Sequence, residues 1–404
     1  MGWKVCGKFN GNQIEIGTMN APEANPMHPL ANPTRRQLLT HVAGAAVVAT
    51  LGMPALAQNK PVRVGATFDD SSVEKANGQG LFQGSTAYFN AVNKAGGING
   101  SKIELVKADD KFNPDSAKQN ALAFAADPAV IALLHPLGTR QTAMVMDAVP
   151  GMAVVGPNTG TVALRKKPVQ NTFWVRANYD QEVDKLVQTA AVLGITRIGI
   201  VYSNDGLGQS VLAAYTAALK KANLEPAVLA TTPSTVSMEV GAAAEAIAKA
   251  KPQVVIAGLA GTAPAFIKAL RKAGGKSTVY GLSITASSLP SLGEDARGVG
   301  FAIIVPSPVA TRYEIVRRYQ ADMIASGFND FSLVSLEGYM DACVLAEGMR
   351  RAGPGATRAA LMAALDHIES WDMGGVKINF GRGNHEGSQF VDVAVIGENG
   401  RLLS

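Results

Sequence analysis

The stretch AGGINGSKIELVKADD, residues 95–110, contains the end of one predicted element and the whole of the next. Gly96 and Gly97 end a helical pattern, because glycine adopts the backbone conformations that close a helix. Residues 103–108 then form a short, largely apolar run of strand length, and Asp109 and Asp110 follow it. The stretch therefore predicts a helix, a tight turn and a strand in immediate succession.

The same alternation continues on both sides of this stretch. Strands are predicted at residues 62–67, 103–108, 130–134 and 153–155, and helices at 81–95, from 114 onward and at 139–148. The run at 130–134 is apolar throughout, which is typical of a strand buried on both faces of a parallel sheet. Alternating strands and helices predict a parallel sheet that is covered by helices on both faces.

A second series of the same kind follows the first. Its strands are predicted at residues 197–202, 227–229, 254–257, 278–281 and 301–305, and its helices at 179–193, 207–222, 240–249 and 263–273. The chain ends with helical stretches at 313–326, 333–352 and 357–365 and with short strands at 376–380 and 391–396. The fold class is therefore α/β, with two similar lobes, each a doubly wound parallel sheet.

Composition excludes several classes of protein. The formal charge is +5, but four basic and two acidic residues precede Gln58, which leaves 33 basic and 30 acidic residues in the rest. The basic cluster Arg165-Lys166-Lys167 is predicted to be a solvated loop, and no basic run with interleaved aromatics predicts nucleic-acid binding. Cys343 has no second cysteine after residue 57, so no disulfide is expected, and no Cys/His spacing predicts a metal site.

Residues 34–57 have the pattern of an export signal. Arg35 and Arg36 precede an uncharged stretch at 38–56, and Ala55-Leu56-Ala57 has the small-x-small form of a cleavage site. The arginine pair resembles the twin-arginine export motif, and an ordinary secretory signal is the alternative. We therefore expect residues 1–57 to be an N-terminal extension and a cleaved signal peptide at about 27–57, and the mature protein to be periplasmic.

Motifs for catalysis and cofactors are weak. Residues 205–210, DGLGQS, have two of the three glycines of a dinucleotide-binding loop, but no acid ends the following strand. His385-Glu386 is predicted to be loop. His135 follows a predicted strand, where ligands of α/β sheets bind, but the pattern places no nucleophile or acid beside it. The sequence thus predicts a binding protein with no cofactor rather than an enzyme.

Several of these segments together resemble the leucine/isoleucine/valine-binding protein family, the type I solute-binding proteins of ABC importers. The resemblance rests on VRVG at 62–65, AGGING at 95–100, DD at 109–110 and NP at 113–114, and further on IGIVYS at 198–203, GLG at 206–208 and KAGG at 272–275. It covers about residues 60–400. It implies two lobes that close on a ligand, hinged by crossings near residues 177–178, 306–307 and 372–374. Lobe 1 would be 58–177 plus 307–372, and lobe 2 would be 178–306 plus 373–404.

The resemblance also implies ligand-binding residues. In amino-acid-binding members, two loops of lobe 1 hold the ligand carboxylate, and they match residues 136–141 and 157–161 here. The expected contacts are Leu137, Gly138, Thr139, Asn158, Thr159 and Gly160. Thr139 is also expected to be the N-cap of its helix, and Arg140 to be able to pair with an acidic ligand.

Lobe 2 departs from the pattern of amino-acid binders. The matching contact positions hold Leu207, within a loop that includes Asp205, and Ala260, while Ser283 stands where the family has the acid that neutralises the ligand ammonium. Asn77 stands where a tyrosine is usual near the cleft mouth. Because a buried ammonium without a carboxylate is costly, Asp69, Asp70 or Asp205 would have to replace that acid. Otherwise an aromatic acid or another carboxylate is the better prediction.

The leading hypothesis is a monomeric periplasmic component that binds an amino acid or another small carboxylate and delivers it to a membrane permease of an ABC importer. A binding protein that presents its closed form to a receptor or a regulator is the second hypothesis. An exported α/β enzyme is the third, and the missing catalytic set argues against it.

Overall fold

The computed structural model describes residues 59–403, apart from 168–169, 287, 382 and 399–401. A parallel sheet has the strand order β2-β1-β3-β4-β5. Its strands are β1 (Asn59–Phe68), β2 (Ser101–Asp109), β3 (Val130–Leu134), β4 (Ala153–Val155) and β5 (Thr172–Phe173). β3 and β4 are buried at every position, as expected for apolar strands covered on both faces.

A second sheet has the order β14-β13-β10-β9-β8-β6-β7. Its strands are β6 (Ile198–Ser203), β7 (Leu229–Thr232), β8 (Val254–Gly258), β9 (Thr278–Gly281), β10 (Gly300–Ile303), β13 (Asp392–Ile396) and β14 (Leu402–Leu403). Strands β10, β9, β8, β6 and β7 are parallel to one another. β13 is antiparallel to β10, and β14 is antiparallel to β13. Separately, β11 (Trp371–Asp372) pairs with β12 (Lys377–Ile378).

We call the first sheet and the helices that go with it lobe 1. These helices are α2 (Lys75–Lys94), α3 (Pro114–Ala126), α4 (Thr139–Ala148), α5 (Val162–Arg165), α10 (Glu314–Ala325), α11 (Leu333–Ala352) and α12 (Arg358–Asp366). Lobe 2 is the second sheet with α6 (Tyr179–Val192), α7 (Gly206–Lys221), α8 (Gly241–Ala250), α9 (Ala263–Lys272) and the 3₁₀ segments η2 (Ser283–Thr285) and η3 (Leu289–Ala296). The predicted α/β fold class with two parallel-sheet lobes is confirmed.

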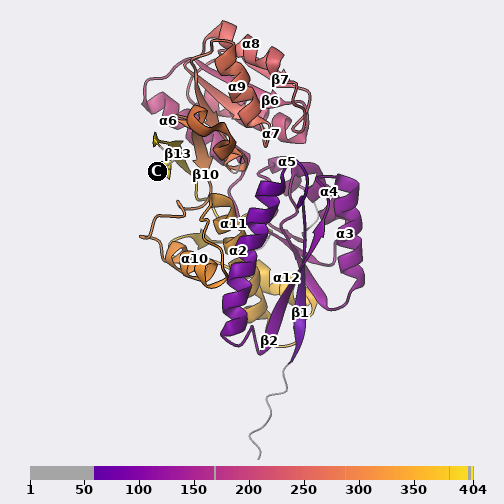
Figure 1. Cartoon of the computed structure of the whole chain (residues 1–404). Coiled ribbons are helices and arrows are strands. Elements are labelled where there is room, and N and C mark those ends of the chain that lie inside the picture. Colours follow the sequence, from indigo (N-terminus) through magenta and orange to yellow (C-terminus); the bar gives the residue numbers. More distant parts are fainter. Residues whose placement is uncertain (1–58, 168–169, 287, 382, 399–401, 404) are drawn as a thin grey trace, which may run out of the picture. The chain divides into compact units, whose positions relative to one another are not determined.

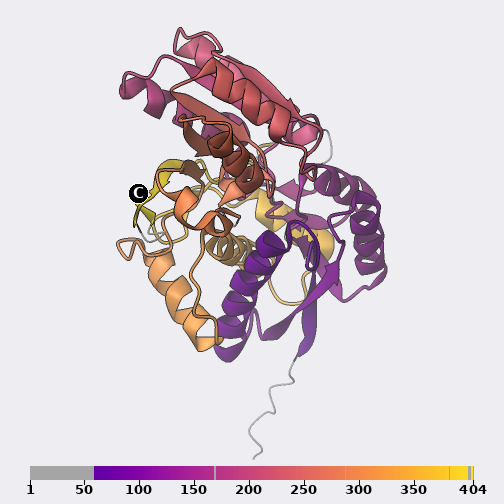
Figure 2. The same ribbon diagram turned by 45° about the horizontal axis from the view of Figure 1, so that its top comes forward.

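The late helices of the chain return to lobe 1. α10 and α11 pack against α2, so these orange helices lie beside the indigo helix in Figures 1 and 2. α12 packs against β3 and β4. Two glycines permit this contact: a Cβ on Gly84 would lie 1.8 Å from the carbonyl oxygen of Ser335, and one on Gly338 would lie 2.1 Å from that of Leu81. The α2 and α11 backbones therefore touch directly, which few side chains would allow.

The structure corrects some sequence-based boundaries. α2 begins at Lys75 and not at residue 81, because polar residues extend the helix beyond its apolar stripe. β7 begins at Leu229, where residues 227–229 were predicted, and only Lys377–Ile378 of the predicted strand at 376–380 pairs with a neighbour. Arg165 was predicted to lie in a solvated loop, but it belongs to α5, its side chain is buried, and its guanidinium lies 4.8 Å from the centre of the Trp174 ring.

The predicted N-terminal extension, the signal peptide and Cys6 lie outside the described residues. None of the helices in the described part of the chain combines the length and the apolar character that a membrane span requires. The same part of the chain contains no group of three or more His, Cys, Asp or Glu side chains that could hold a metal ion. Cys343 in this part is a buried free cysteine.

Candidate functional site

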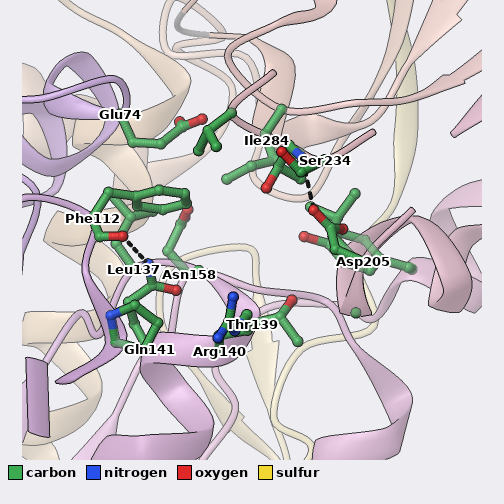
Figure 3. A pocket seen from close by; sticks show the side chains of 18 residues that line it. Glu74, Phe112, Leu137, Thr139, Arg140, Gln141, Asn158, Asp205, Ser234 and Ile284 are labelled. Carbon is green, nitrogen blue, oxygen red and sulfur yellow. Dashed lines mark hydrogen bonds between the residues drawn. The ribbon is translucent and has the colours of Figure 1, made fainter. Parts of the chain in front are cut away.

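A cavity of about 230 Å³ lies between lobe 1 and lobe 2, and both lobes contribute to its walls. Figure 3 shows the side chains around it. Its apolar walls are formed by Phe112, Leu137, Leu207, Val236, Ala260 and Ile284. This volume lies below the roughly 300–1,000 Å³ of pockets for drug-sized ligands, so the cavity suits a small molecule with an apolar body.

The lobe 1 wall contains the beginning of α4. Gly138 is the N-cap residue, with φ of 98°, and no side chain caps the helix. The prediction that Thr139 is the N-cap was therefore wrong: Thr139 is the first helical residue, and its hydroxyl lies 2.9 Å from the hydroxyls of both Thr159 and Thr161. The first N–H groups of an uncapped helix lack partners within the helix, and they favour a negative charge at this wall.

Asn158 lies beside the beginning of α4. Its backbone N–H donates to Pro136 and its carbonyl accepts from Gly138, at 3.0 and 3.3 Å, so the two loops of lobe 1 are joined. The Asn158 side chain lines the cavity, and its buried Oδ1 atom has no hydrogen-bond partner. A buried acceptor without a partner is unusual in native proteins, and it marks this wall as a place where a donor from a ligand would fit.

The lobe 2 wall begins at α7. Asp205 is the N-cap of α7, and it accepts hydrogen bonds from Gly208 N–H, Thr235 N–H and the Ser203 hydroxyl at 3.3, 2.7 and 2.8 Å. It lines the cavity, but three donors already use its oxygens. The main role of Asp205 is therefore to stabilise the loops of lobe 2.

Glu74 is a cavity-lining residue that the sequence analysis did not identify. It precedes α2, its exposed fraction is 2%, and its carboxylate accepts from Asn77 Nδ2 at 2.7 Å and from Gly261 N–H of lobe 2 at 2.8 Å. Burial raises the pKa of Glu74 to about 7. No sequence motif marks this residue; an earlier predicted start for α2 would have placed it at a helix end.

The eleven residues expected at the site divide into two groups. Those that line the cavity are Leu137, Gly138, Thr139, Asn158, Asp205, Leu207 and Ala260. The other four lie behind the lining: Asn77 donates to Glu74, Thr159 bonds to Thr139, Gly160 packs against the Tyr179 ring, and Ser283 bonds to Glu182. Asn77, Thr159 and Gly160 thus contact residues of the wall, whereas the partner of Ser283, Glu182, does not line the cavity.

The other predicted charges lie in different environments. Arg140 lines the cavity and is exposed. Asp69 is buried, and its carboxylate accepts backbone N–H groups of the next loop, those of Ser71, Ser72 and Glu74. Asp70 pairs with Lys107 at 2.6 Å. Asp69 and Asp70 are therefore engaged in holding the loop that carries Glu74.

A buried charge cluster connects the lobes behind the cavity. Arg176 Nη2 lies 2.6 Å from Glu182 Oε1 of α6, and Arg176 Nη1 lies 3.5 Å from Glu337 Oε1 of α11. In lobe 2, the Ser283 Oγ atom accepts from Arg176 Nη2 at 2.5 Å, and the Ser283 backbone N–H donates to Glu182 at 2.9 Å. Burial raises the pKa of Glu337 to about 7, although Arg176 opposes this shift. Ser283 thus serves this cluster and does not line the cavity.

His135 has neighbours that the sequence pattern did not show. Ser85 Oγ lies 2.5 Å from His135 Nε2, and Asp341 Oδ2 lies 3.1 Å from His135 Nδ1. Ser85 comes from α2 and Asp341 from α11, so only the fold brings the three together. All three are fully buried, burial lowers the pKa of His135 to about 4, and none lines the cavity. This arrangement packs α2 and α11 against β3.

Comparisons with known proteins agree with the two-lobed α/β fold. A family model described as periplasmic binding protein matches residues 61–401. A substrate-binding periplasmic protein from Ralstonia solanacearum is 30% identical, covers 85% of this chain and 99% of its own, and has a TM-score of 0.77.

Two curated relatives match part of the chain. The Leu/Ile/Val-binding protein homolog 1 of Brucella abortus is 31% identical over 149 residues, which are 37% of this chain and 39% of that protein. The amino acid binding protein of Pseudomonas aeruginosa is 25% identical over 166 residues, 40% of this chain and 44% of that protein. The match thus spans less than half the length of either relative.

Proposed function

This chain belongs to the leucine/isoleucine/valine-binding family of type I periplasmic binding proteins, and we propose that it captures a small carboxylate-bearing solute, in the first place an amino acid, between its lobes. Members of this family work in the periplasm or outside the cell. We further propose that the protein is exported by the signal at residues 27–57, works as a monomer and delivers its ligand to the permease of an ABC importer.

The observation that carries this proposal is the uncapped beginning of α4 at the cavity wall. α4 offers backbone N–H groups and the positive end of a helix dipole, and no side chain occupies them. The Thr139 hydroxyl lies next to this helix end. A ligand carboxylate there would gain charge-assisted hydrogen bonds in a largely buried place.

The apolar walls support a branched or ring-shaped body on the ligand. Leu207, Ala260 and Ile284 are buried and line the cavity from lobe 2. Leucine-sized side chains would bury apolar area there at about 25 cal/mol per Å². Phe112 in the opposite wall would stack equally well on an aromatic acid, so an aromatic carboxylate is the second candidate.

Ligand addition is expected to compact and stabilise the protein. We propose hinge crossings near residues 177–178, 306–307 and 372–374, and a ligand that bridges both lobes favours their closure. Small-angle scattering of ligand-stripped protein should show a smaller radius of gyration when leucine or 4-hydroxybenzoate binds, and Tm should rise by mass action. Tight binding without compaction would contradict closure of the lobes on the ligand.

Thr139→Ala is expected to weaken carboxylate binding by about tenfold or more, because a hydrogen bond to a charged group contributes about 1.5–3 kcal/mol. Calorimetric titration measures the effect. Thr357→Ala is the matched control, since Thr357 caps α12 outside the cavity and accepts from Ala360 N–H at 3.2 Å. That control should lower stability by about 1 kcal/mol and leave affinity unchanged. Equal affinities in wild type and Thr139→Ala would move the carboxylate site elsewhere.

A further inference from the structure

Glu74 places a negative group at the side of the cavity that faces away from α4. Figure 3 shows Glu74 on one side of the cavity and Thr139 and Arg140 on the other. One side thus offers a helix N-terminus and a guanidinium, and the other offers a carboxyl group with an exposed fraction of 2%. The cavity is therefore polarised along its length, which favours a ligand with opposite charges at its two ends.

We propose that Glu74 is the cation-binding residue of this cavity, and that the ligand carries a positively charged group, such as an ammonium, which Glu74 receives while α4 receives the anionic end. This inference rests on the proposed function and adds the charge of the ligand's second end. It assigns the contact with the ligand cation to Glu74 of lobe 1. Within the described lining, the acid of lobe 2 is Asp205, and its oxygens already accept three hydrogen bonds.

Hydrogen-bond capacity distinguishes Glu74 from the other acids near the cavity. Each Glu74 oxygen accepts one bond from the protein, Oε1 from Gly261 N–H and Oε2 from Asn77 Nδ2. A carboxylate has about four acceptor positions, so about two remain for a ligand. Asp205 accepts three hydrogen bonds at the beginning of α7, and Asp69 accepts three from its own loop. Glu74 is the acid with most unused capacity.

The hydrogen bonds from Asn77 and Gly261 also fix the orientation of the Glu74 carboxyl group. Asn77 belongs to the first turn of α2, it is buried, and its Nδ2 atom lies 3.3 Å from the carbonyl oxygen of Ile284. Gly261 belongs to the loop before α9, and a Cβ there would lie 2.8 Å from Glu74 Oε1. Both lobes thus hold the carboxyl group, so a ligand cation at Glu74 would be enclosed by both.

Cation binding at Glu74 should release a proton. Burial raises the pKa of Glu74 to about 7, backbone and side-chain hydrogen bonds from Gly261 and Asn77 oppose this, and the charge of Asp69 adds to it. Arg140 and Asp205 are the other charged side chains in the cavity wall. At pH 6 most Glu74 side chains hold a proton when the cavity is empty. An arriving ammonium favours the carboxylate, so the proton passes to the buffer and the ligand keeps its own charge.

The test is isothermal titration of the ligand-stripped full protein with two series of probes. The first series is the twenty standard amino acids. The second is acids that lack the ammonium group: isovalerate, 4-methylpentanoate, benzoate and 4-hydroxybenzoate. Titration at pH 6 in phosphate and in bis-Tris, two buffers of different ionisation enthalpy, counts the protons exchanged. We expect an amino acid to bind with release of about 0.9 proton at pH 6 and almost none at pH 8.5.

Glu74→Gln should abolish this proton release and weaken amino-acid binding by about 10- to 150-fold, which corresponds to the loss of a hydrogen bond to a charged group. Glu398→Gln is the control, because it removes an exposed carboxylate that pairs with Arg297 outside the cavity. It should leave both affinity and proton release as in the wild type.

Each outcome decides. Amino-acid binding without proton release at pH 6, or with proton uptake, overturns the role of Glu74. Binding of the second series alone overturns the role of Glu74 and leaves the proposed function intact. Binding by neither series overturns both. Because the proton count is measured on the wild type, the test does not depend on the folding of Glu74→Gln.

Discussion

Arg176→Met is expected to lower the free energy of unfolding by about 3–5 kcal/mol, as is typical when one partner of a buried ion pair is removed. Arg176 and Glu182 are buried, and their charged atoms lie 2.6 Å apart. Methionine fills a similar volume but leaves Glu182 and Glu337 without their cation. The expected loss is therefore electrostatic and not a packing defect.

The pKa of Arg176 supports this cost. Burial alone would lower it, but the charges of Glu337 and Glu182 raise it above its ordinary value, so the guanidinium stays charged inside the protein. Without it, the Glu182 carboxylate keeps only the N–H and hydroxyl of Ser283, at 2.9 and 3.0 Å. Two neutral donors compensate a buried carboxylate less well than a guanidinium does.

Urea unfolding at pH 7 measures the effect, with two comparisons. Arg297→Ala is the control, because Arg297 pairs with Glu398 on the surface, where both side chains are about 70% exposed; its loss should cost less than about 1 kcal/mol. Adding Glu182→Gln and Glu337→Gln to Arg176→Met should recover part of the stability, since the unpaired charges disappear. A loss below about 1 kcal/mol for Arg176→Met would show that the cluster is not coupled.

The fold was predictable because its signals are local. The apolar run at Val130–Leu134 is buried at each position. Asn113-Pro114 begins α3, and the Asn113 side chain accepts hydrogen bonds from the N–H groups of Asp115 and Ser116. Such patterns depend on neighbours within a few residues. Helix and strand boundaries were less predictable, as the early start of α2 shows, because a first turn without large apolar side chains gives no apolar periodicity.

The candidate site was predictable only in segments whose sequence resembles the loops of the family. Leu137–Thr139 and Asn158 lie in segments that resemble family loops, and they line the cavity. Glu74 was missed because its carboxylate accepts a hydrogen bond from Gly261, which lies far away in the sequence. No pattern in the residues around Glu74 predicts that contact. Ser85 and Asp341 were missed as partners of His135 for the same reason, since helices α2 and α11 supply them.

The free energy of unfolding of the ligand-free protein is expected to fall as the pH rises from about 5 to 8. Burial raises the pKa values of Glu74, Asp110 and Glu337 to about 7, from 4.5, 3.8 and 4.5. Between these limits the folded protein holds protons that the unfolded chain has lost, so stability decreases with rising pH. His135 acts oppositely between about 6.5 and 4, because its lowered pKa makes the folded protein bind fewer protons there. The decrease should therefore be steepest near pH 6, between the pKa values of the unfolded and folded acids.

Glu74→Gln isolates one of these contributions. Below about pH 3.5 Glu74 is neutral in both the folded and the unfolded wild type, and the variant should match the wild type. At pH 8 the wild type contains a buried carboxylate that the variant lacks. Because the pKa of Glu74 rises from 4.5 to about 7 on folding, the variant should be more stable by about 3 to 4 kcal/mol. Urea unfolding across this pH range measures the difference, with Glu398→Gln as an exposed control that should follow the wild type. Parallel profiles for Glu74→Gln and wild type would mean that the pKa of Glu74 is not raised in the empty cavity, which would contradict both the expected proton release and the proposed role of Glu74.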